Sequence, residues 1–123
     1  VRGAASIAQG KTEFLELGNL DIERDWGYAP DYVLGMWMML QQEEADDYIL
    51  ATGKTHKLSD FLQLSFKYFG LDYQKHIRIN PKFVRPNEPQ KLCGDSSKAQ
   101  KLLNWTPSVS FTDLIHEMCK LAK

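Results

Sequence analysis

Few segments of this 123-residue chain carry the pattern of a β-strand, and this scarcity restricts the folds it can adopt. Three short segments qualify, at residues 13–17, 48–52 and 77–79, each followed closely by a glycine or a proline. Stretches with helical spacing lie between them, and this alternation is typical of α/β or α+β architecture. Three short strands are too few for a self-sufficient doubly wound sheet. We therefore expect an α/β fold with few sheet elements that forms one part of a larger protein.

Two helices are expected in the first half of the chain. Residues 4–8 are good helix formers that stop before Gly10, and Pro30 stands where a proline favours the first turn of a helix. The second helix has apolar residues at i, i+3, i+4 and i+7: Val33, Met36, Trp37 and Leu40. The acidic segment 43–47 ends it.

Three further helical patterns follow, separated by a loop-like segment at residues 80–95. The first ends at Gly70 and has the apolar stripe Leu58, Phe61, Leu62, Ser65 and Phe69. The second is expected to be capped by Asp95 and to point inward with Ala99, Leu102 and Leu103. The last begins at a capping box of Ser110 and Asp113 and has the stripe Phe111, Leu114, Ile115, Met118 and Ala122.

Composition excludes several classes of partner. With 15 basic and 16 acidic side chains, the chain lacks the positive footprint of proteins that bind nucleic acids or anionic membranes. No apolar run approaches the roughly 20 residues that cross a bilayer, and no signal-peptide pattern is visible. Cys93 and Cys119 lack metal-ligand spacing, so we expect free thiols and a cytoplasmic protein. The chain starts at Val1 in what reads as the middle of an element, so we expect further residues before it.

The familiar catalytic and cofactor motifs are absent from the sequence. Its glycines form no GxGxxG or GxxxxGK[ST] loop, and no tyrosine has a lysine four residues later. His56, His76 and His116 stand singly; we expect His116 on the polar side of the last helix and His56 in a surface loop. We therefore predict that the chain holds no catalytic, cofactor-binding or metal-binding residue and serves as the binding part of something larger.

Charged side chains at two turns are the remaining candidates for a site. Arg24 follows the first strand and its turn, and Arg85 and Glu88 share a proline-containing loop. A guanidinium binds phosphate oxygens in pairs, and a carboxylate can accept both hydroxyls of a ribose. The pattern therefore suits a nucleoside diphosphate. The plainer alternative is a surface ion pair, which for Arg24 means a salt bridge to Asp25 or Glu23.

Five blocks of sequence occur in a specific order. They are GNLDIERDWGYAPDYV at 18–33 with MWMMLQ at 36–41, ATG at 51–53 with His56, RPNE at 85–88, GDSSKA at 94–99, and LNWTP at 103–107 with Phe111. With these blocks the chain resembles the GDP-mannose 4,6-dehydratase family of extended short-chain dehydrogenases/reductases over nearly its whole length. The first block separates this family from most of its relatives, whereas the later ones are shared more widely.

The resemblance implies a two-lobed enzyme, a lyase that converts GDP-mannose to GDP-4-keto-6-deoxymannose with NADP. Its N-terminal Rossmann half, expected before Val1, binds NADP and supplies the catalytic residues, and the intact enzyme is expected to be a homo-oligomer. This chain, residues 1–123, matches the C-terminal lobe, which binds the nucleotide sugar. By analogy, Arg24 and Arg85 contact the diphosphate and Glu88 the ribose. The strand near residues 15–17 runs alongside the guanine.

The same resemblance has residues 30–52 packing on the Rossmann sheet. The three tryptophans are expected in packing roles: Trp26, Trp37 and Trp105. Two positions depart from the family pattern: Lys57 replaces a capping serine, so we expect Thr55 or Ser59 to cap, and Pro89 removes a backbone donor beside the expected ribose site. The alternatives are the C-terminal part of a related nucleotide-sugar reductase or epimerase, and a non-catalytic module that binds nucleotide sugars.

Overall fold

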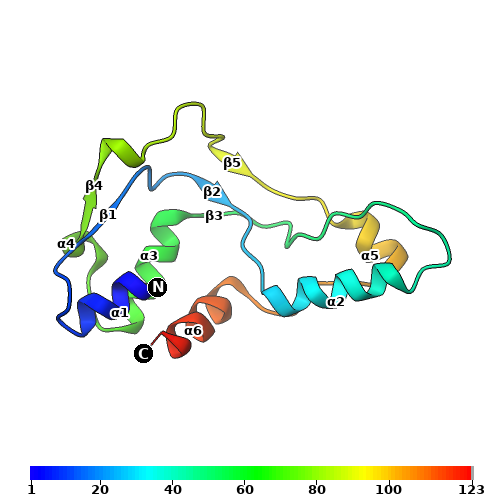
Figure 1. Ribbon diagram of the computed structural model, residues 1–123, viewed down its shortest axis with the longest axis horizontal. Coiled ribbons are helices and arrows are strands. Elements are labelled where there is room, and N and C mark those ends of the chain that lie inside the picture. Colours follow the sequence, from blue (N-terminus) through cyan, green and yellow to red (C-terminus); the bar gives the residue numbers. More distant parts are fainter. Residues whose placement is uncertain (123) are drawn as a thin grey trace.

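The computed structural model describes residues 1–122, which form an elongated molecule with helices at both ends and short strands between them (Figure 1). The helices are α1 (Arg2–Ala8), α2 (Ala29–Leu40), α3 (Leu58–Tyr68), α4 (Tyr73–His76), α5 (Ser97–Leu103) and α6 (Phe111–Leu121). The strands are β1 (Leu15–Leu17), β2 (Glu23–Arg24), β3 (His56–Lys57), β4 (Ile77–Ile79) and β5 (Lys91–Leu92), and η1 (Pro81–Phe83) is a 3₁₀ turn. The alternation of helices and strands confirms the predicted α/β class.

Two small sheets connect the helices. β1 and β4 pair in parallel, with Leu15 opposite Ile77. β2 lies between β3, to which it is antiparallel, and β5, to which it is parallel. The strands predicted near residues 13–17 and 77–79 are confirmed. The two-residue strands β2, β3 and β5 were not predicted, because two residues are too few to show an alternating pattern.

The strand predicted at residues 48–52 is wrong for this structure. The segment is an irregular connection in which Ala51 is buried and Ile49 is 59% exposed, and Gly53 at φ +74° closes it. The apolar residues suit a strand, but in the part of the chain described here no strand lies alongside to pair with their backbone groups. Strand propensity depends on such a partner.

The first of two apolar clusters joins α1, α3 and β1. Its buried members are Ala4, Ile7, Leu62 and Phe66. α6 packs against α3 and buries Leu114, Ile115 and Cys119, whereas Met118 of its predicted stripe is 40% exposed. Burial raises the pKa of the Cys119 thiol, so this side chain stays protonated. Cys119 and the exposed Cys93 are both free, as predicted.

The second cluster joins α2, α5 and the connection at residues 48–52. Its buried members are Ala99, Leu103 and Trp105, and the partly buried side chains packed on them are Tyr32, Met38, Met39, Tyr48 and Leu50. Gly35 allows α2 to approach closely, since a Cβ there would lie 2.6 Å from a methyl carbon of Leu50. Trp105 Nε1 donates to the backbone oxygen of Asp31 at 2.7 Å. The packing predicted for Trp105 is confirmed.

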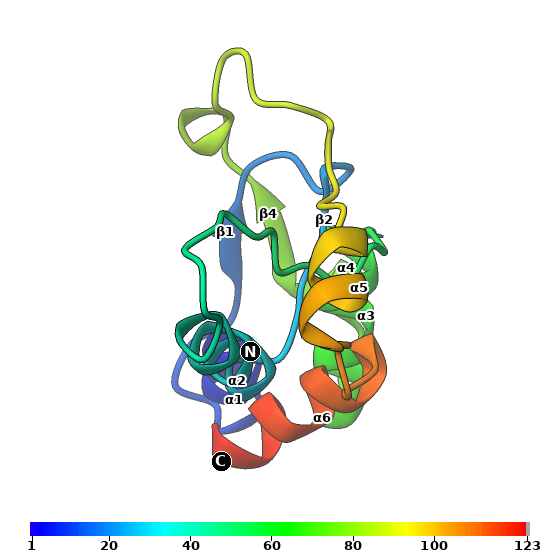
Figure 2. The same cartoon turned by 90° about the vertical axis from the view of Figure 1, so that its right-hand side faces the viewer.

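The predicted apolar stripe of α2 faces outward in this structure. Its members are Val33, Met36, Trp37 and Leu40, with exposed fractions of 63, 56, 57 and 81%; we call them the α2 outer stripe. Only the opposite face of α2 has a partner among the described elements, in α5 and residues 48–52 (Figure 2). The packing role predicted for Trp37 is therefore wrong here. Leu102, predicted to point inward from α5, is also wrong at 52% exposed, because this short helix has a neighbour on one side only.

Caps and turns mark the helix ends. Gly10 and Gly70 have φ of +70° and +73° and follow α1 and α3 as predicted. The N-cap of α5 is Ser96 and not Asp95 as predicted, although the Asp95 carboxylate accepts from the Ser97 backbone N–H at 2.9 Å, which also lowers the pKa of Asp95. Ser110 caps α6, its hydroxyl oxygen accepting from the Asp113 N–H.

The start of α3 differs from the prediction. Lys57 itself is the N-cap, and the Asp60 carboxylate accepts from its backbone N–H at 3.1 Å. Ser59 lies inside the helix, and the Thr55 hydroxyl donates instead to Glu23 at 2.7 Å. The expectation that Thr55 or Ser59 caps is therefore wrong, because an acidic residue in the first turn satisfies the cap from within the helix.

Candidate functional site

The guanidinium of Arg24 is held by three oxygens where β2 and β5 pair in the small sheet. Its Nη2 lies 2.8 Å from Oε1 of Glu88, an ion pair between residues 64 apart in sequence. Its Nη1 donates to the backbone oxygens of Glu23 at 2.7 Å and Pro89 at 3.0 Å. The side chains of Arg24 and Glu88 are only 20% and 19% exposed. Arg24 therefore forms its salt bridge with Glu88, and not with the neighbouring Asp25 or Glu23.

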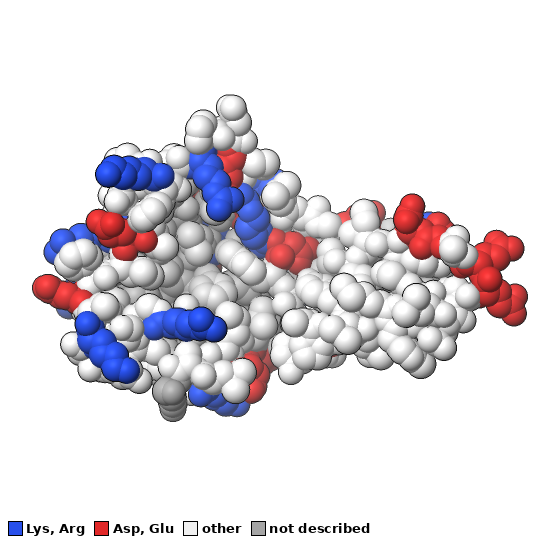
Figure 3. Space-filling view, in the orientation of Figure 1, with Lys and Arg blue, Asp and Glu red and all other residues white. Residues whose placement is uncertain are grey.

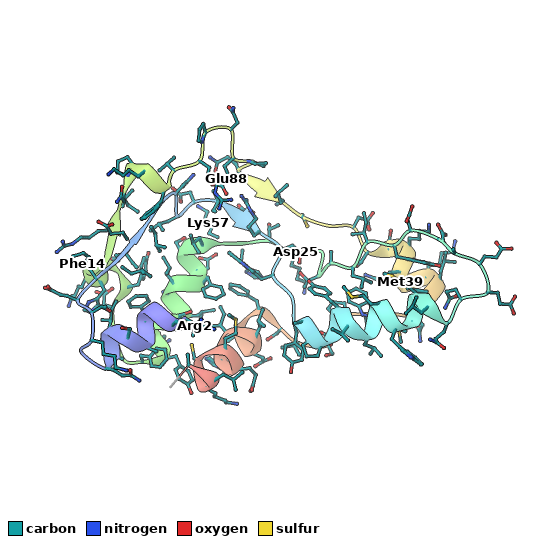
Figure 4. All side chains as sticks on the ribbon, viewed as in Figure 1. Arg2, Phe14, Asp25, Met39, Lys57 and Glu88 are labelled. Carbon is teal, nitrogen blue, oxygen red and sulfur yellow. The ribbon has the colours of Figure 1, made fainter. Side chains whose placement is uncertain are left out.

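The loop between η1 and β5 carries the other two candidate residues. It projects from the body of the molecule in both ribbon views and turns at Asn87, whose φ is +62° (Figures 1 and 2). Its return to the sheet is fixed by the Glu23 N–H, which donates to the Gln90 oxygen at 2.7 Å. Glu88 therefore lies beside β2, where it contacts Arg24 (Figure 4). Pro89, which lacks a donor, contributes its carbonyl oxygen to Arg24.

Arg85 remains exposed in this loop. Within residues 1–122 its side chain has no hydrogen bond or ion pair, and it does not pair with Glu88. The structure thus brings Arg24 and Glu88 into contact and leaves Arg85 in the same loop as a cation without a partner. The sequence predicts all three residues as site candidates. It does not predict the ion pair between Arg24 and Glu88, because no local pattern shows that β2 and β5 are neighbours.

A hollow with a volume of about 400 Å³ lies next to Arg24. It is lined by Arg24, Asp25, Tyr32, Ile49, Leu50, Ala51, Leu92, Cys93 and Gly94. Burial, and secondarily the charges of Asp25 and Asp31, raise the pKa of Tyr32, so its hydroxyl stays protonated. Gly94 permits the close approach of this wall, since a Cβ would lie 2.4 Å from that of Ala51.

Asp25 is a residue that the sequence reasoning missed. Its carboxylate accepts from the Thr52 N–H at 3.0 Å, the Thr52 hydroxyl at 2.5 Å and the Gly53 N–H at 2.9 Å. These bonds fix the end of β2, directly after Arg24, to a turn far along the chain. In Figure 4, Asp25 lies at the junction between the two ends of the molecule. Its place beside Arg24 suggested only a local ion pair.

A second hollow of about 380 Å³ lies between the 52–56 turn and the start of α6. His56 lines it and stacks on Phe111, with ring centroids 3.8 Å apart and 1° between the planes. Trp26 stacks on Phe111 as well and packs at a tilt against Phe61, so its predicted packing is confirmed. The surface-loop role expected for His56 is wrong, because His56 belongs to strand β3 and packs against the ring of Phe111. His116 is exposed on α6, as predicted.

Acidic side chains gather at the tip beyond α2, whereas the opposite end and the region of the small sheet carry basic and acidic side chains together (Figure 3). At the acidic tip, Lys98 donates to Asp46 at 2.6 Å, and this bond is the main cause of a lowered Asp46 pKa. An anionic ligand is therefore disfavoured at the tip.

The residues described do not fit a bound NADP or a metal ion. The glycines with positive φ are Gly10, Gly53 and Gly70, and none of them links the end of a strand to the start of a helix, as a pyrophosphate cradle requires. Three or more His, Cys, Asp or Glu side chains do not converge anywhere in residues 1–122. Across the same residues, no helix is both long and apolar enough to cross a membrane.

Two solved structures share the fold of this chain. A structure of RMD from Pseudomonas aeruginosa complexed with NADPH matches with a TM-score of 0.86 at 20% identity, over 98% of this chain and 40% of that one. A UDP-glucuronic acid 4-epimerase from Bacillus cereus, in complex with UDP-glucuronic acid and NAD, matches with a TM-score of 0.80 at 21% identity, over 98% and 38%. The chain therefore shares the fold of the matching parts of these two structures.

Sequence comparison gives the family. The GDP-mannose 4,6 dehydratase family profile matches residues 1–118. A GDP-mannose 4,6 dehydratase of Drosophila melanogaster is 45% identical over 97% of this chain and 34% of its own length. GDP-mannose 4,6 dehydratase 1 of Arabidopsis thaliana is 45% identical over 95% and 32%, and the human enzyme is 39% identical over 95% and 36%. The chain belongs to the GDP-mannose 4,6 dehydratase family and spans about a third of the length of these relatives.

Proposed function

We propose that this chain holds the nucleotide end of GDP-mannose in a GDP-mannose 4,6-dehydratase, a lyase that forms GDP-4-keto-6-deoxymannose with NADP. One observation carries the proposal: Arg24 and Glu88 meet at 2.8 Å, and the loop that brings Glu88 there carries the unpaired Arg85. Two guanidinium groups can bind a diphosphate, and a carboxylate can accept the hydroxyls of the ribose attached to it. Family membership supplies the guanine and mannose parts of the ligand.

Each residue has a distinct role in this proposal. Arg85, exposed and without a protein acceptor, binds the diphosphate oxygens through its planar fork. Arg24, on the middle strand β2, binds the same diphosphate from the other side, and Glu88 accepts the ribose hydroxyls. β1 has β4 on one edge only among the described strands, so its other edge is open to run alongside the guanine.

NADP and the catalytic groups belong, in this proposal, to parts of the protein other than residues 1–123. The α2 outer stripe supports this, because an apolar face of this size normally has a partner. The irregular segment 48–52 also supports this proposal. Its residues suit a strand but have no partner strand here, and a neighbouring Rossmann sheet would provide one. We therefore propose that residues 30–52 pack on such a sheet, and that the intact enzyme is a homo-oligomer. The free thiols Cys93 and Cys119 suit the cytoplasm.

Calorimetric titration of the full-length protein with GDP tests the proposal. Arg85→Ala should weaken GDP binding at least tenfold, because charged hydrogen bonds contribute about 1.5–3 kcal/mol each. Lys82→Ala removes a positive charge from η1, close to the same loop, and should change the affinity less than about threefold. Equal affinities for wild type and Arg85→Ala would reject the proposed site.

The same titration on the isolated 123 residues addresses the idea of a free-standing binding module. We expect weak binding or none, because one wall of the site is contributed by the rest of the protein. A folded chain that gives no heat with GDP excludes the module, whereas affinity equal to that of the full-length protein would favour it.

A further inference from the structure

The carboxylate of Asp25 bonds to a distant turn with both of its oxygens. Oδ1 accepts from the backbone N–H of Thr52 at 3.0 Å and from the Thr52 hydroxyl at 2.5 Å, and Oδ2 accepts from the Gly53 N–H at 2.9 Å. The donors lie 27 and 28 residues away in sequence. Hydrogen bonds to an ionised acceptor are about twice as strong as neutral ones, so this carboxylate holds the turn firmly.

The backbone around these bonds is closely packed. A Cβ on Gly27 would overlap the Tyr32 hydroxyl and lie 3.0 Å from the Thr52 methyl carbon. The Thr52 hydroxyl also accepts from the Lys54 N–H at 3.2 Å, and Gly53 closes the turn with a φ of +74°. The end of β2 and the turn therefore form one well-defined contact, which we call the Asp25 joint (Asp25, Thr52 and Gly53).

The Asp25 joint lies between two parts with different tasks in the proposed function. On one side, Arg24 directly precedes Asp25 and pairs with Glu88 at 2.8 Å. On the other side, Thr52 ends the segment 48–52, which is proposed to pack on a Rossmann sheet. The hollow next to Arg24 is lined from both sides, by Arg24 with Asp25 and by residues 49–51. The Asp25 joint therefore fixes Arg24 relative to the segment 48–52.

We propose that Asp25 is a positioning residue that sets how far a bound nucleotide sugar reaches toward the catalytic groups of the Rossmann half. This inference rests on the proposed function. The Asp25 carboxylate is engaged by Thr52 and Gly53, so it acts through them and not by contact with the nucleotide. Releasing it leaves Arg24, Arg85 and Glu88 able to bind, but lets the segment 48–52 shift relative to them. A misplacement of about 1 Å at the reacting atoms can lower a rate about a hundredfold.

The test measures kcat for GDP-mannose and the affinity for GDP on the full-length protein, in wild type and in Asp25→Asn. The amide keeps the size of the side chain but replaces one acceptor oxygen by an NH₂ group. We expect kcat to fall about tenfold or more while the GDP affinity changes less than about threefold, the opposite of the pattern for a residue that only binds the nucleotide. The retained GDP affinity also shows that the site is folded. An unchanged kcat, or a GDP affinity that falls as much as kcat, overturns the inference.

Variants of Thr52 test whether Asp25 acts through the turn, and they keep the inference testable if Asp25→Asn does not fold. Thr52→Val removes the hydroxyl donor but keeps the shape, so kcat should fall about threefold. Thr52→Ser keeps the donor and should match wild type. The double variant of Asp25→Asn with Thr52→Val should be no slower than Asp25→Asn alone, because both remove the same contact. Two losses that multiply, or a Thr52→Val variant with wild-type kcat, contradict the role.

The two proposals fail in different ways. A wild-type protein that neither binds GDP nor converts GDP-mannose rejects the proposed function. A wild-type protein that does both, with an Asp25→Asn variant of equal kcat, rejects only the positioning role of Asp25.

Discussion

At the scale of single residues, Asp31 connects the start of α2 to the corner between α5 and α6. Its carboxylate accepts from the Ser108 N–H at 2.8 Å and the Ser108 hydroxyl at 2.6 Å, and its backbone oxygen accepts from Trp105. The residue is 8% exposed. Through these bonds the first turn of α2 fixes the corner between α5 and α6, which keeps the second apolar cluster closed.

Asp31→Asn should therefore lower the free energy of unfolding by about 1–3 kcal/mol, the usual effect of breaking charged hydrogen bonds at a buried site. Urea denaturation of the chain measures it. Glu44→Gln, at the exposed acidic tip, is the matched control and should stay within about 0.5 kcal/mol of wild type. Equal losses in the two variants would mean that the Asp31 bonds do not hold the corner.

Glu23 gives the chain a predictable response to acid. A hydrogen bond from Thr55, with a smaller effect of Lys91, lowers its pKa from the ordinary value of 4.5. The unfolded chain then binds a proton more readily than the folded one, so the stabilisation from this group is present above pH 4.5 and is lost as the pH falls through the lowered folded value.

Thr55→Val removes the main cause of this shift. The pKa of Glu23, followed by carbon NMR of its carboxyl group, should rise toward the ordinary value, and the acid-dependent loss of stability should become shallower. A Glu23 titration curve that does not move would show that Thr55 is not the cause.

The individual residues of the candidate site could be predicted from the sequence. Arg24, Arg85 and Glu88 could be identified because their side-chain chemistry and the sequence blocks around them are local features. Their contacts could not be predicted, since the ion pair joins residues 64 apart. For the same reason the three bonds of Asp25 could not be predicted: a carboxylate does not reveal in sequence which distant turn it will cap.

At the scale of elements, α2 has an apolar face that no other element covers within residues 1–122. One face packs on Ala99, Leu103 and Trp105, whereas the α2 outer stripe is more than half exposed. Helical periodicity located the helix and an apolar stripe correctly, but periodicity alone cannot say which neighbour covers a face. The wrong strand prediction at 48–52 has the same cause. These residues suit a strand, but their sequence does not show whether a partner strand lies beside them.

The exposed stripe should make the isolated chain associate. In sedimentation velocity at micromolar concentration we expect species larger than a monomer of 14.1 kDa. The double variant Trp37→Lys with Leu40→Lys should sediment as a monomer, because it places two charges in the apolar face. Leu121→Lys, at a residue 88% exposed on α6, should associate like wild type. Association that persists in the double variant would exclude the stripe as its cause.

At the scale of the whole molecule, two apolar clusters lie at opposite ends of the elongated molecule, and the small β3–β2–β5 sheet lies between them. The candidate site lies at this sheet, where Arg24 meets the loop that carries Arg85 and Glu88. The chain spans about a third of the length of its curated relatives. The overall class was predictable from alternating strands and helices, whereas the arrangement of the clusters depends on long-range contacts that periodicity does not encode.

Steady-state kinetics of GDP-mannose conversion by the full-length protein, wild type against Arg85→Ala, test the central claim most directly. We predict that the wild type forms GDP-4-keto-6-deoxymannose, and that Arg85→Ala raises KM for GDP-mannose about tenfold or more with a smaller effect on kcat, because Arg85 binds the part of the substrate that does not react. A wild-type protein that does not convert GDP-mannose, or an Arg85→Ala variant with an unchanged KM, would contradict it.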